Sequence, residues 1–150
     1  MKKDETDNSY GTIEWEDGLY TGLLHSGVPH GKGHLKRNNG DWYSGDFQFG
    51  FMHGQGEYHW FEGDAYEGDF KDDLPHGHGV KKWKHGAFFE GTWQNGVRCG
   101  KGTFKSPGGY CYTGEFQNDW FHGEGIYSWP DGSVESGIWL KGTLAKPKGI

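Results

Sequence analysis

Residues 43–65 read YSGDFQFGFMHGQGEYHWFEGDA, and the chain repeats this pattern along most of its length. Each copy opens with an aromatic residue that is followed two residues later by glycine, and the copies succeed one another without insertion. Self-similarity at a fixed period of this size is typical of repeat proteins, in which each unit is stabilised largely by its neighbours. The copies are 23 residues long and begin at Tyr20, Tyr43, Tyr66, Phe89 and Tyr112.

Each copy predicts one β-hairpin. We number the opening aromatic residue of each copy as position 0. Positions 0, 2 and 4 hold an aromatic residue, a glycine and an apolar residue. These three positions share one face of a strand because side chains alternate. Glycines at positions 11 and 13 and mostly apolar residues at position 15 predict a second strand with the same face apolar. Positions 14 and 16 are more polar. The pattern indicates an antiparallel sheet with one aromatic and one largely polar face.

Two turns separate the strands. Position 20 is always glycine, which is a strong turn signal between strands. Position 7 is occupied by Gly27, Gly50, Asp73, Gly96 and Asp119, so we expect a left-handed residue there. The predicted fold is all-β: a single-layer antiparallel meander of β-hairpin repeats with about a dozen strands, elongated and twisted. We expect a flexible segment at residues 1–9, a repeat domain at 10–142 with a half repeat at each end, and a tail at 143–150.

The composition limits the classes of function. A net charge of −6 gives no basic field for nucleic acid. The start MKKDETDNSY has no apolar core typical of a secretory signal, and no apolar run approaches membrane-spanning length. Cys99 and Cys111 are therefore expected to be free thiols in a reducing compartment, with a disulfide as the lesser alternative. A turn centred near Pro107 and Gly108 would place Cys111 opposite Phe104.

The repeat resembles the MORN repeat (membrane occupation and recognition nexus), whose pattern is close to YxGxWxxGxxHGxGxxxxxDG. The resemblance covers about residues 10–142 and departs from the pattern at a few positions. These departures are Leu24 and Glu135 in place of aromatic residues, Cys99 in place of histidine, and Asp73 and Asp119 in place of glycine. The resemblance implies a β-hairpin solenoid that acts as a scaffold or binding module, found in cytoskeletal, flagellar and membrane-associated proteins.

The aromatic face is the first candidate site. A single-layer sheet has no second layer to cover it, and exposed apolar surface often marks an interface. Tyrosine and tryptophan are also favoured anchors of protein contacts. The face can equally serve as the core. The candidate residues for binding a peptide or helix of a partner protein are Tyr58, Trp60, Trp83, Phe104, Tyr127 and Trp129.

A basic strip in the third and fourth repeats is the second candidate. It would contact an acidic partner or lipid headgroups, against the simpler interpretation of a solvated polar face. Its residues are Lys81, Lys82, Lys84, Arg98, Lys101 and Lys105.

Metal binding and catalysis have little support in the sequence. His30, His53, His76 and His122 share position 10, but equivalent atoms of successive repeats lie about 9.6 Å apart, too far to share one zinc ion. Only His78 adds a second histidine within one repeat. No motif for nucleophilic, metal-dependent or phosphate chemistry is present. We predict no cofactor, no metal and no enzymatic activity.

The predicted function is a non-catalytic scaffold that holds a partner segment on its aromatic face, in a cytoskeletal, flagellar or membrane-associated assembly. Two alternatives stay open: phospholipid tethering through the basic residues, and service as the targeting module of a larger enzyme. Pairing of two copies through a terminal strand is a further possibility. The expected location is the cytoplasm, in association with the cytoskeleton or a membrane.

Overall fold

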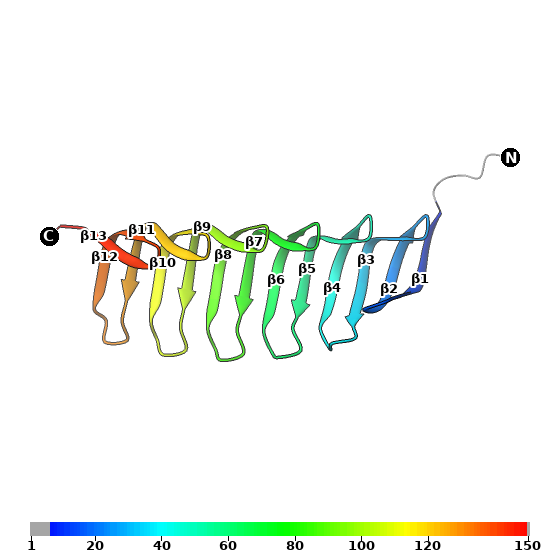
Figure 1. Ribbon diagram of the computed structural model, residues 1–150, viewed down its shortest axis with the longest axis horizontal. Coiled ribbons are helices and arrows are strands. Elements are labelled where there is room, and N and C mark those ends of the chain that lie inside the picture. The colour runs from blue at the N-terminus through cyan, green and yellow to red at the C-terminus, as the bar shows by residue number, and fades with distance from the viewer. Residues whose placement is uncertain (1–6, 150) are drawn as a thin grey trace. The chain divides into compact units, whose positions relative to one another are not determined.

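The computed structural model describes residues 7–149, which form thirteen β-strands and no helix. Contacts divide the chain into two units, residues 1–74 and 75–150, and each is described by itself. In both units each strand pairs antiparallel with the next one in the chain (Figure 1). The predicted antiparallel meander of β-hairpin repeats is confirmed.

The unit of residues 1–74 is a six-stranded meander. Its strands pair in the order of the chain. Repeat glycines face one another across each pair, as Gly45 faces Gly56, and each opening aromatic residue faces an apolar or aromatic residue, as Tyr43 faces Tyr58. The strands are β1 (Asn8–Trp15), β2 (Gly18–His25), β3 (Val28–Arg37), β4 (Trp42–Gln48), β5 (Phe51–His59) and β6 (Ala65–Lys71).

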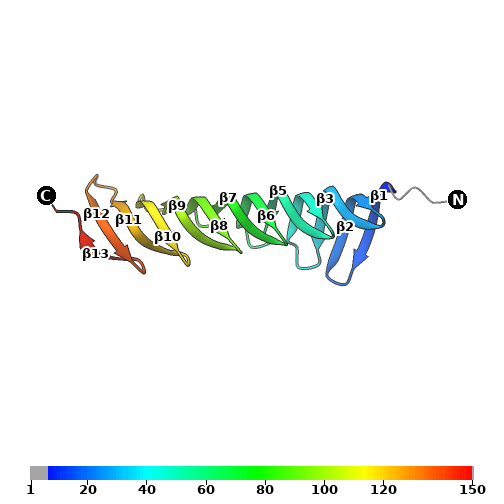
Figure 2. The same cartoon turned by 90° about the horizontal axis from the view of Figure 1, so that it is seen from above.

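The unit of residues 75–150 follows the same plan, and Figure 2 shows its strands from above. Its first strand begins one residue before the boundary between the units. The strands are β7 (Leu74–Lys82), β8 (Phe88–Gln94), β9 (Val97–Lys105), β10 (Cys111–Gln117), β11 (Trp120–Ser128), β12 (Val134–Leu140) and β13 (Thr143–Pro147).

The short turns confirm the left-handed residue at position 7. In β4–β5 only Phe49 and Gly50 lie between the paired residues Gln48 and Phe51, with φ of 49° and 84°. Two successive residues of positive φ define a type I′ turn, whose twist matches that of the flanking strands. The residues at position 7 all have positive φ: Gly27, Gly50, Asp73, Gly96 and Asp119.

The longer turns correct one prediction about register. In the β9–β10 turn the Ser106 N–H donates to the Tyr110 carbonyl, 2.8 Å away, so the turn is centred on Gly108. Cys111 therefore pairs with Lys105, and Tyr112 is the residue opposite Phe104. The expectation that Cys111 faces Phe104 was wrong by one residue, because it placed the centre between Pro107 and Gly108. Both cysteines are free.

The core consists of aromatic rings that lie over glycines of the same sheet. The Tyr43 hydroxyl donates to the Asp46 carbonyl at 2.7 Å, which folds the ring across the facing pair Gly45 and Gly56. A Cβ on Gly56 would lie 2.3 Å from that hydroxyl oxygen, so only glycine fits. The same tyrosine-to-carbonyl bond recurs from Tyr20, Tyr66 and Tyr112.

Edge-to-face ring contacts join these tyrosines to the apolar residue at position 4. Tyr43 contacts Phe47 and Phe70 with ring centroids 5.1 and 5.0 Å apart, and Tyr112 contacts Phe116 at 5.2 Å. Such pairs add to the stabilisation from burial alone. The residues at positions 0 and 4 are buried from the second repeat to the last, and Tyr20 is buried in the first.

Both predicted end segments contain some regular structure. Thr143–Pro147, which the sequence analysis leaves in a tail, forms β13 and pairs with β12. The predicted flexible segment 1–9 includes Asn8 and Ser9, which belong to β1, while residues 1–6 lie outside the described residues.

The tyrosine-to-carbonyl bond predicts the stability of conservative variants. Replacing Tyr43 or Tyr112 with phenylalanine should lower the free energy of unfolding by about 1 kcal/mol each, because a part-buried carbonyl loses its donor. Urea unfolding measures this. Tyr110→Phe is the matched control, since Tyr110 is exposed, and it should change stability little. Equal losses for all three variants would contradict the proposed role of the bond.

Candidate functional site

The aromatic face contains two sets of residues. The rings at positions 0 and 4 are buried and form the core. All six residues predicted to bind a partner are instead half-buried, so each presents part of its ring to solvent: Tyr58, Trp60, Trp83, Phe104, Tyr127 and Trp129. Those six are therefore available for a second contact.

Four of these residues lie in one chain of ring contacts within residues 75–149. Trp83 contacts Phe104 at 6.0 Å between ring centroids, and Phe104 contacts Phe121 at 6.3 Å. Phe121 contacts Tyr127 at 6.1 Å, and Tyr127 contacts Trp129 at 4.8 Å. Phe121 links the predicted residues, and the sequence analysis did not select it.

The other two predicted residues form a pair in the unit of residues 1–74. Tyr58 and Trp60 lie 4.7 Å apart between ring centroids. The Tyr58 hydroxyl donates to the Asp41 carboxylate at 2.7 Å. Burial, followed by the hydrogen bond to Asp41, raises the pKa of Tyr58 to about 12, so its hydroxyl stays protonated.

A hollow of about 380 Å³ opens among the half-buried rings of residues 75–149. Its apolar walls come from Trp83, Phe104 and Phe121, and Arg98 and Asp119 supply charge. Hollows that combine apolar walls with a few polar groups are typical of binding sites. Its lining is completed by His85, Ala87, Trp120 and Gly142.

The guanidinium group of Arg98 lies among the aromatic rings of this hollow. Its guanidinium carbon lies 5.4 Å from the ring centroid of Phe89 and 5.7 Å from that of Trp83. The side chain is 18% exposed and donates through Nε and Nη2 to the carboxylate and carbonyl of Asp119, at 3.0 and 2.9 Å. Arg98 thus belongs to the aromatic face, although the sequence analysis grouped it with the basic strip.

The predicted basic strip is divided between the two faces of the sheet. Lys81 lies on the aromatic face with its ammonium nitrogen 5.1 Å from the Trp83 ring centroid. Its neighbour Lys82 and the equivalent Lys105 are exposed on the opposite face. Lys101 is also exposed there and lies opposite Glu115 in the β9–β10 register. Lys84 lies outside the strands, in the turn between β7 and β8.

The opposite face carries its own groove, of about 920 Å³, in residues 75–149. The backbone of facing glycines, such as Gly91 and Gly102, forms part of its lining, together with Thr103 and Thr113. Ile126 and Ile138 are 51% and 39% exposed there. Both positive and negative groups line it, including Lys101, Lys146, Glu115 and Glu124. This face is mixed in charge, not basic.

Two departures from the repeat pattern have a shared explanation in the short turns. The Asp73 carboxylate accepts a hydrogen bond of 2.8 Å from the Met52 N–H, and Asp119 accepts one of 2.9 Å from the Arg98 N–H. Met52 and Arg98 occupy position 9 of the preceding repeat. Where position 9 is proline, at Pro29 and Pro75, no N–H exists and the facing turn residue is glycine. The last repeat differs, with Gly142 facing Phe121.

The histidines at position 10 pack against the short turns. The His76 Nδ1 accepts a hydrogen bond of 3.5 Å from the Asn95 N–H in the next short turn of the chain. The His53 Nδ1 lies 3.9 Å from the Asp72 carboxylate. His78, the residue peculiar to its repeat, lies 3.3 Å from the Glu90 carboxylate. Within residues 7–149 no cluster of three or more potential metal ligands occurs.

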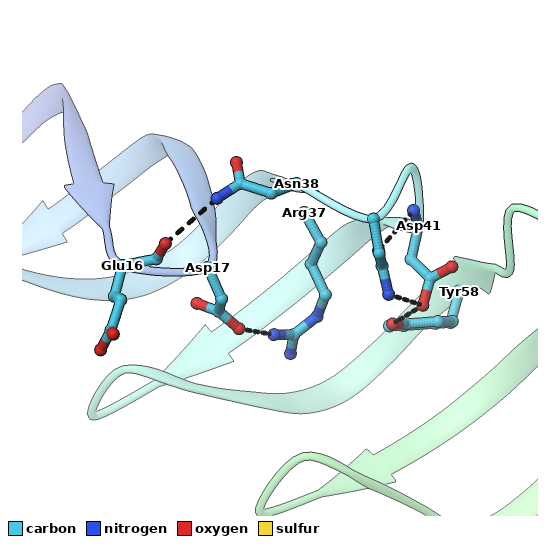
Figure 3. A network of polar contacts seen from close by, with 7 residues as sticks. Glu16, Asp17, Arg37, Asn38, Asp41 and Tyr58 are labelled. Atoms are coloured by element: carbon cyan, nitrogen blue, oxygen red, sulfur yellow. Dashed lines mark hydrogen bonds and ion pairs between the residues drawn. The ribbon is translucent and has the colours of Figure 1, made fainter.

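Asp41 organises the polar contacts of one long turn (Figure 3). It is 8% exposed and accepts hydrogen bonds from the Tyr58 hydroxyl and, at 2.8 Å, from the Phe61 N–H. Nearby, Arg37 pairs with Asp17, and the Asn38 amide donates to the Glu16 carbonyl at 3.1 Å. These contacts join successive turns of the same unit.

The pKa of Asp41 is lowered by these contacts. Burial acts in the opposite direction and would raise the pKa of the carboxyl group. The hydrogen bonds from Phe61, Tyr58 and Asn39 outweigh burial, and the charge of Arg37 adds to their effect. The carboxylate is therefore stabilised in the folded state.

Taken together, the fold and site define a β-hairpin repeat protein with a half-exposed aromatic face. A family comparison agrees, because the model described as "MORN repeat" matches residues 20–42, 43–65, 66–87, 89–109 and 112–134. The chain belongs to the MORN repeat family. Repeats of this family bind proteins or membranes and are generally non-enzymatic.

Two further comparisons add little. A search of curated proteins found no match. Among solved structures, the chain is similar to the TCP domain of SAS-4 (dCPAP) from Drosophila melanogaster, solved in complex with a proline-rich motif of Ana2 (dSTIL). The identity is 10%, the match covers 86% of this chain and 78% of that one, and the TM-score is 0.49. This likeness is too low to support an argument.

None of the residues that the structure describes form a helix with the length and apolar character needed to cross a bilayer.

The turn bond of Asp73 predicts a ranking of variants. Asp73→Ala should lower the free energy of unfolding by roughly 2 kcal/mol, because the Met52 N–H loses its acceptor and alanine tolerates positive φ poorly. Asp73→Asn keeps an acceptor and should cost less than half as much. Gly50→Asp is the matched control, since it faces Pro29 and gains no bond. Urea unfolding in which the alanine and asparagine variants are equally stable would refute this account.

The lowered pKa of Asp41 predicts a pH dependence. A carboxyl group whose pKa is lower in the folded state stabilises the protein above its unfolded value of 3.8, and this contribution is lost as the pH falls through the folded value. The difference in unfolding free energy between wild type and Asp41→Asn should therefore be largest near pH 6 and shrink towards pH 3. Denaturant unfolding at several pH values measures it, and a difference independent of pH would contradict the assignment.

Proposed function

We propose that the protein is a non-catalytic scaffold that holds an extended or helical segment of a partner protein against its aromatic face. The observation that carries this proposal is the hollow in residues 75–149, where half-buried Trp83, Phe104 and Phe121 line one apolar surface. Aromatic residues of this kind are favoured anchors in protein interfaces. Membership of a family whose repeats bind proteins or membranes supports the same class of function.

The mixed charge of the opposite face argues against tethering to an anionic membrane. Such tethering requires several cations on one surface. Here Lys81 and Arg98 lie on the aromatic face, while Lys82, Lys101 and Lys105 are on the other, where Glu115 and Glu124 also lie. We therefore favour a protein partner, in a cytoplasmic assembly associated with the cytoskeleton or with a membrane.

Crosslinking from each face tests the proposal. A photo-crosslinking amino acid replaces Trp83 on the aromatic face or, as the matched control, Thr103 on the opposite face. In the source cell we expect position 83 to yield adducts with one segment of one partner, and position 103 to yield far less. A synthetic peptide of that segment should then bind Phe104→Ala at least roughly tenfold more weakly than wild type.

Folding of each variant is checked by its thermal unfolding. Equal adducts from both positions, or adducts from position 103 alone, would overturn the proposal. A peptide that binds folded Phe104→Ala as tightly as wild type would do the same.

A further inference from the structure

Arg98 has hydrogen-bonding capacity that the described part of the protein does not use. A guanidinium group carries five N–H bonds. Two of them are engaged by residues 7–149, one from Nε and one from Nη2, and both go to Asp119. Among residues 7–149 no group accepts a bond from Nη1, although the side chain is only 18% exposed. The unused N–H bonds, including those of Nη1, therefore belong to a charged guanidinium group that aromatic rings largely shield from water.

Two further N–H donors line the same hollow. The His85 Nδ1 accepts a hydrogen bond of 3.2 Å from the Ala87 N–H, so a neutral His85 carries its proton on Nε2. The Trp120 side chain is 55% exposed, and its indole N–H has no acceptor in the described part of the chain. Arg98, His85 and Trp120 thus give the hollow an excess of donors.

The carboxylate already present in the hollow pairs with Arg98. One of its oxygens, Oδ1 of Asp119, accepts from both Nε and the backbone N–H of Arg98, at 3.0 and 2.9 Å. Its charge is therefore compensated within the protein. An incoming cation would have to compete with Arg98, whereas an incoming anion meets unused donors. The surrounding rings of Trp83, Phe104 and Phe121 lower the local dielectric and strengthen such a contact.

We infer that this hollow binds the carboxylate side chain of an aspartate or glutamate in the partner segment, with Arg98 as the principal donor. The inference rests on the proposed function and specifies the chemistry of the partner. An apolar or aromatic residue beside the acid contacts Trp83 and Phe104, and the carboxylate accepts from the Arg98 Nη1 group. Trp120 and His85 supply secondary donors. The recognised element is an acidic residue next to an apolar one.

The chain itself provides a matched variant for the test. Met52 occupies the same repeat position as Arg98, and its N–H donates to Asp73 as that of Arg98 does to Asp119. Arg98→Met therefore reproduces an arrangement that already folds in this protein. It keeps the backbone bond to Asp119 and removes only the guanidinium group.

The experiment selects binders from a phage-displayed library of random peptides, about 12 residues long, on the full wild-type chain and on Arg98→Met. We expect peptides selected on wild type to share an aspartate or glutamate beside an apolar residue, and peptides selected on Arg98→Met to lack that acid. The best wild-type binder is then synthesised with its acid and with the corresponding amide, and binding is measured by fluorescence anisotropy.

Removing the acid should weaken binding to wild type by about tenfold or more, as expected for a hydrogen bond to a charged group. On Arg98→Met the acid and amide peptides should bind within about twofold of one another. Trp120→Phe removes one N–H and keeps the ring, so it should reduce the preference for the acid by a smaller factor.

The outcomes separate the inference from the proposed function. Selected peptides that need Phe104 but show no acid preference would overturn the inference and leave the scaffold proposal standing. An acid preference of equal size on wild type and Arg98→Met would also overturn it. If no selected peptide depends on Phe104, the aromatic face is not a binding site and both proposals fail.

Discussion

The structure depends on the close approach between the opening aromatic ring of each repeat and two glycines that face one another across a strand pair. Within residues 7–149 each unit is a single sheet and has no helix, so the rings must find their apolar contacts on the sheet itself. Tyr43 does this by lying over Gly45 and Gly56 and donating to the Asp46 carbonyl. The β4–β5 pairing also shifts register between Gly45 and Phe47. The tyrosine, the glycines and this register shift therefore form one constraint, and the pairing of strands in register follows from it.

That constraint determines which positions are free to carry function. Positions 0 and 4 are used for the core and are buried, as in Tyr112 and Phe116. Positions 15 and 17 lie beyond the glycines, where the rings of Phe104 and Trp129 are only half-covered. Position 9 lies on the same face and also varies, with proline, methionine, arginine or phenylalanine. A repeat protein of this kind can thus change its binding chemistry at position 9 while its core stays unchanged.

Much of this architecture could be predicted from the sequence, because its determinants are local. Alternation of side chains places the aromatic face, and the chemistry of glycine and aspartate identifies the left-handed turn residues. The features that were missed depend on contacts between repeats. Arg98 was assigned to a basic strip because Lys101 and Lys105 follow it, whereas the rings of Trp83 and Phe116 surround it. Arg98 holds position 9, an odd-numbered position like 13, 15 and 17 of the same strand, which lie on the aromatic face. This alternation could have placed Arg98 on that face, and it could have identified Phe121, which also holds position 9.

Position 9 also explains why the two units offer different surfaces. In residues 7–74 the Met52 side chain is 4% exposed, so its apolar surface is already covered by the protein. The Tyr58 hydroxyl there already donates to the Asp41 carboxylate. In residues 75–149 Arg98 and Phe121 remain half-buried beside a hollow. The two units share one repeat pattern, and in the second the hollow combines apolar walls with the guanidinium group of Arg98. Under the proposed function, discrimination between partners would depend on residues that the repeat pattern leaves variable, such as Arg98 and Phe121 beside this hollow.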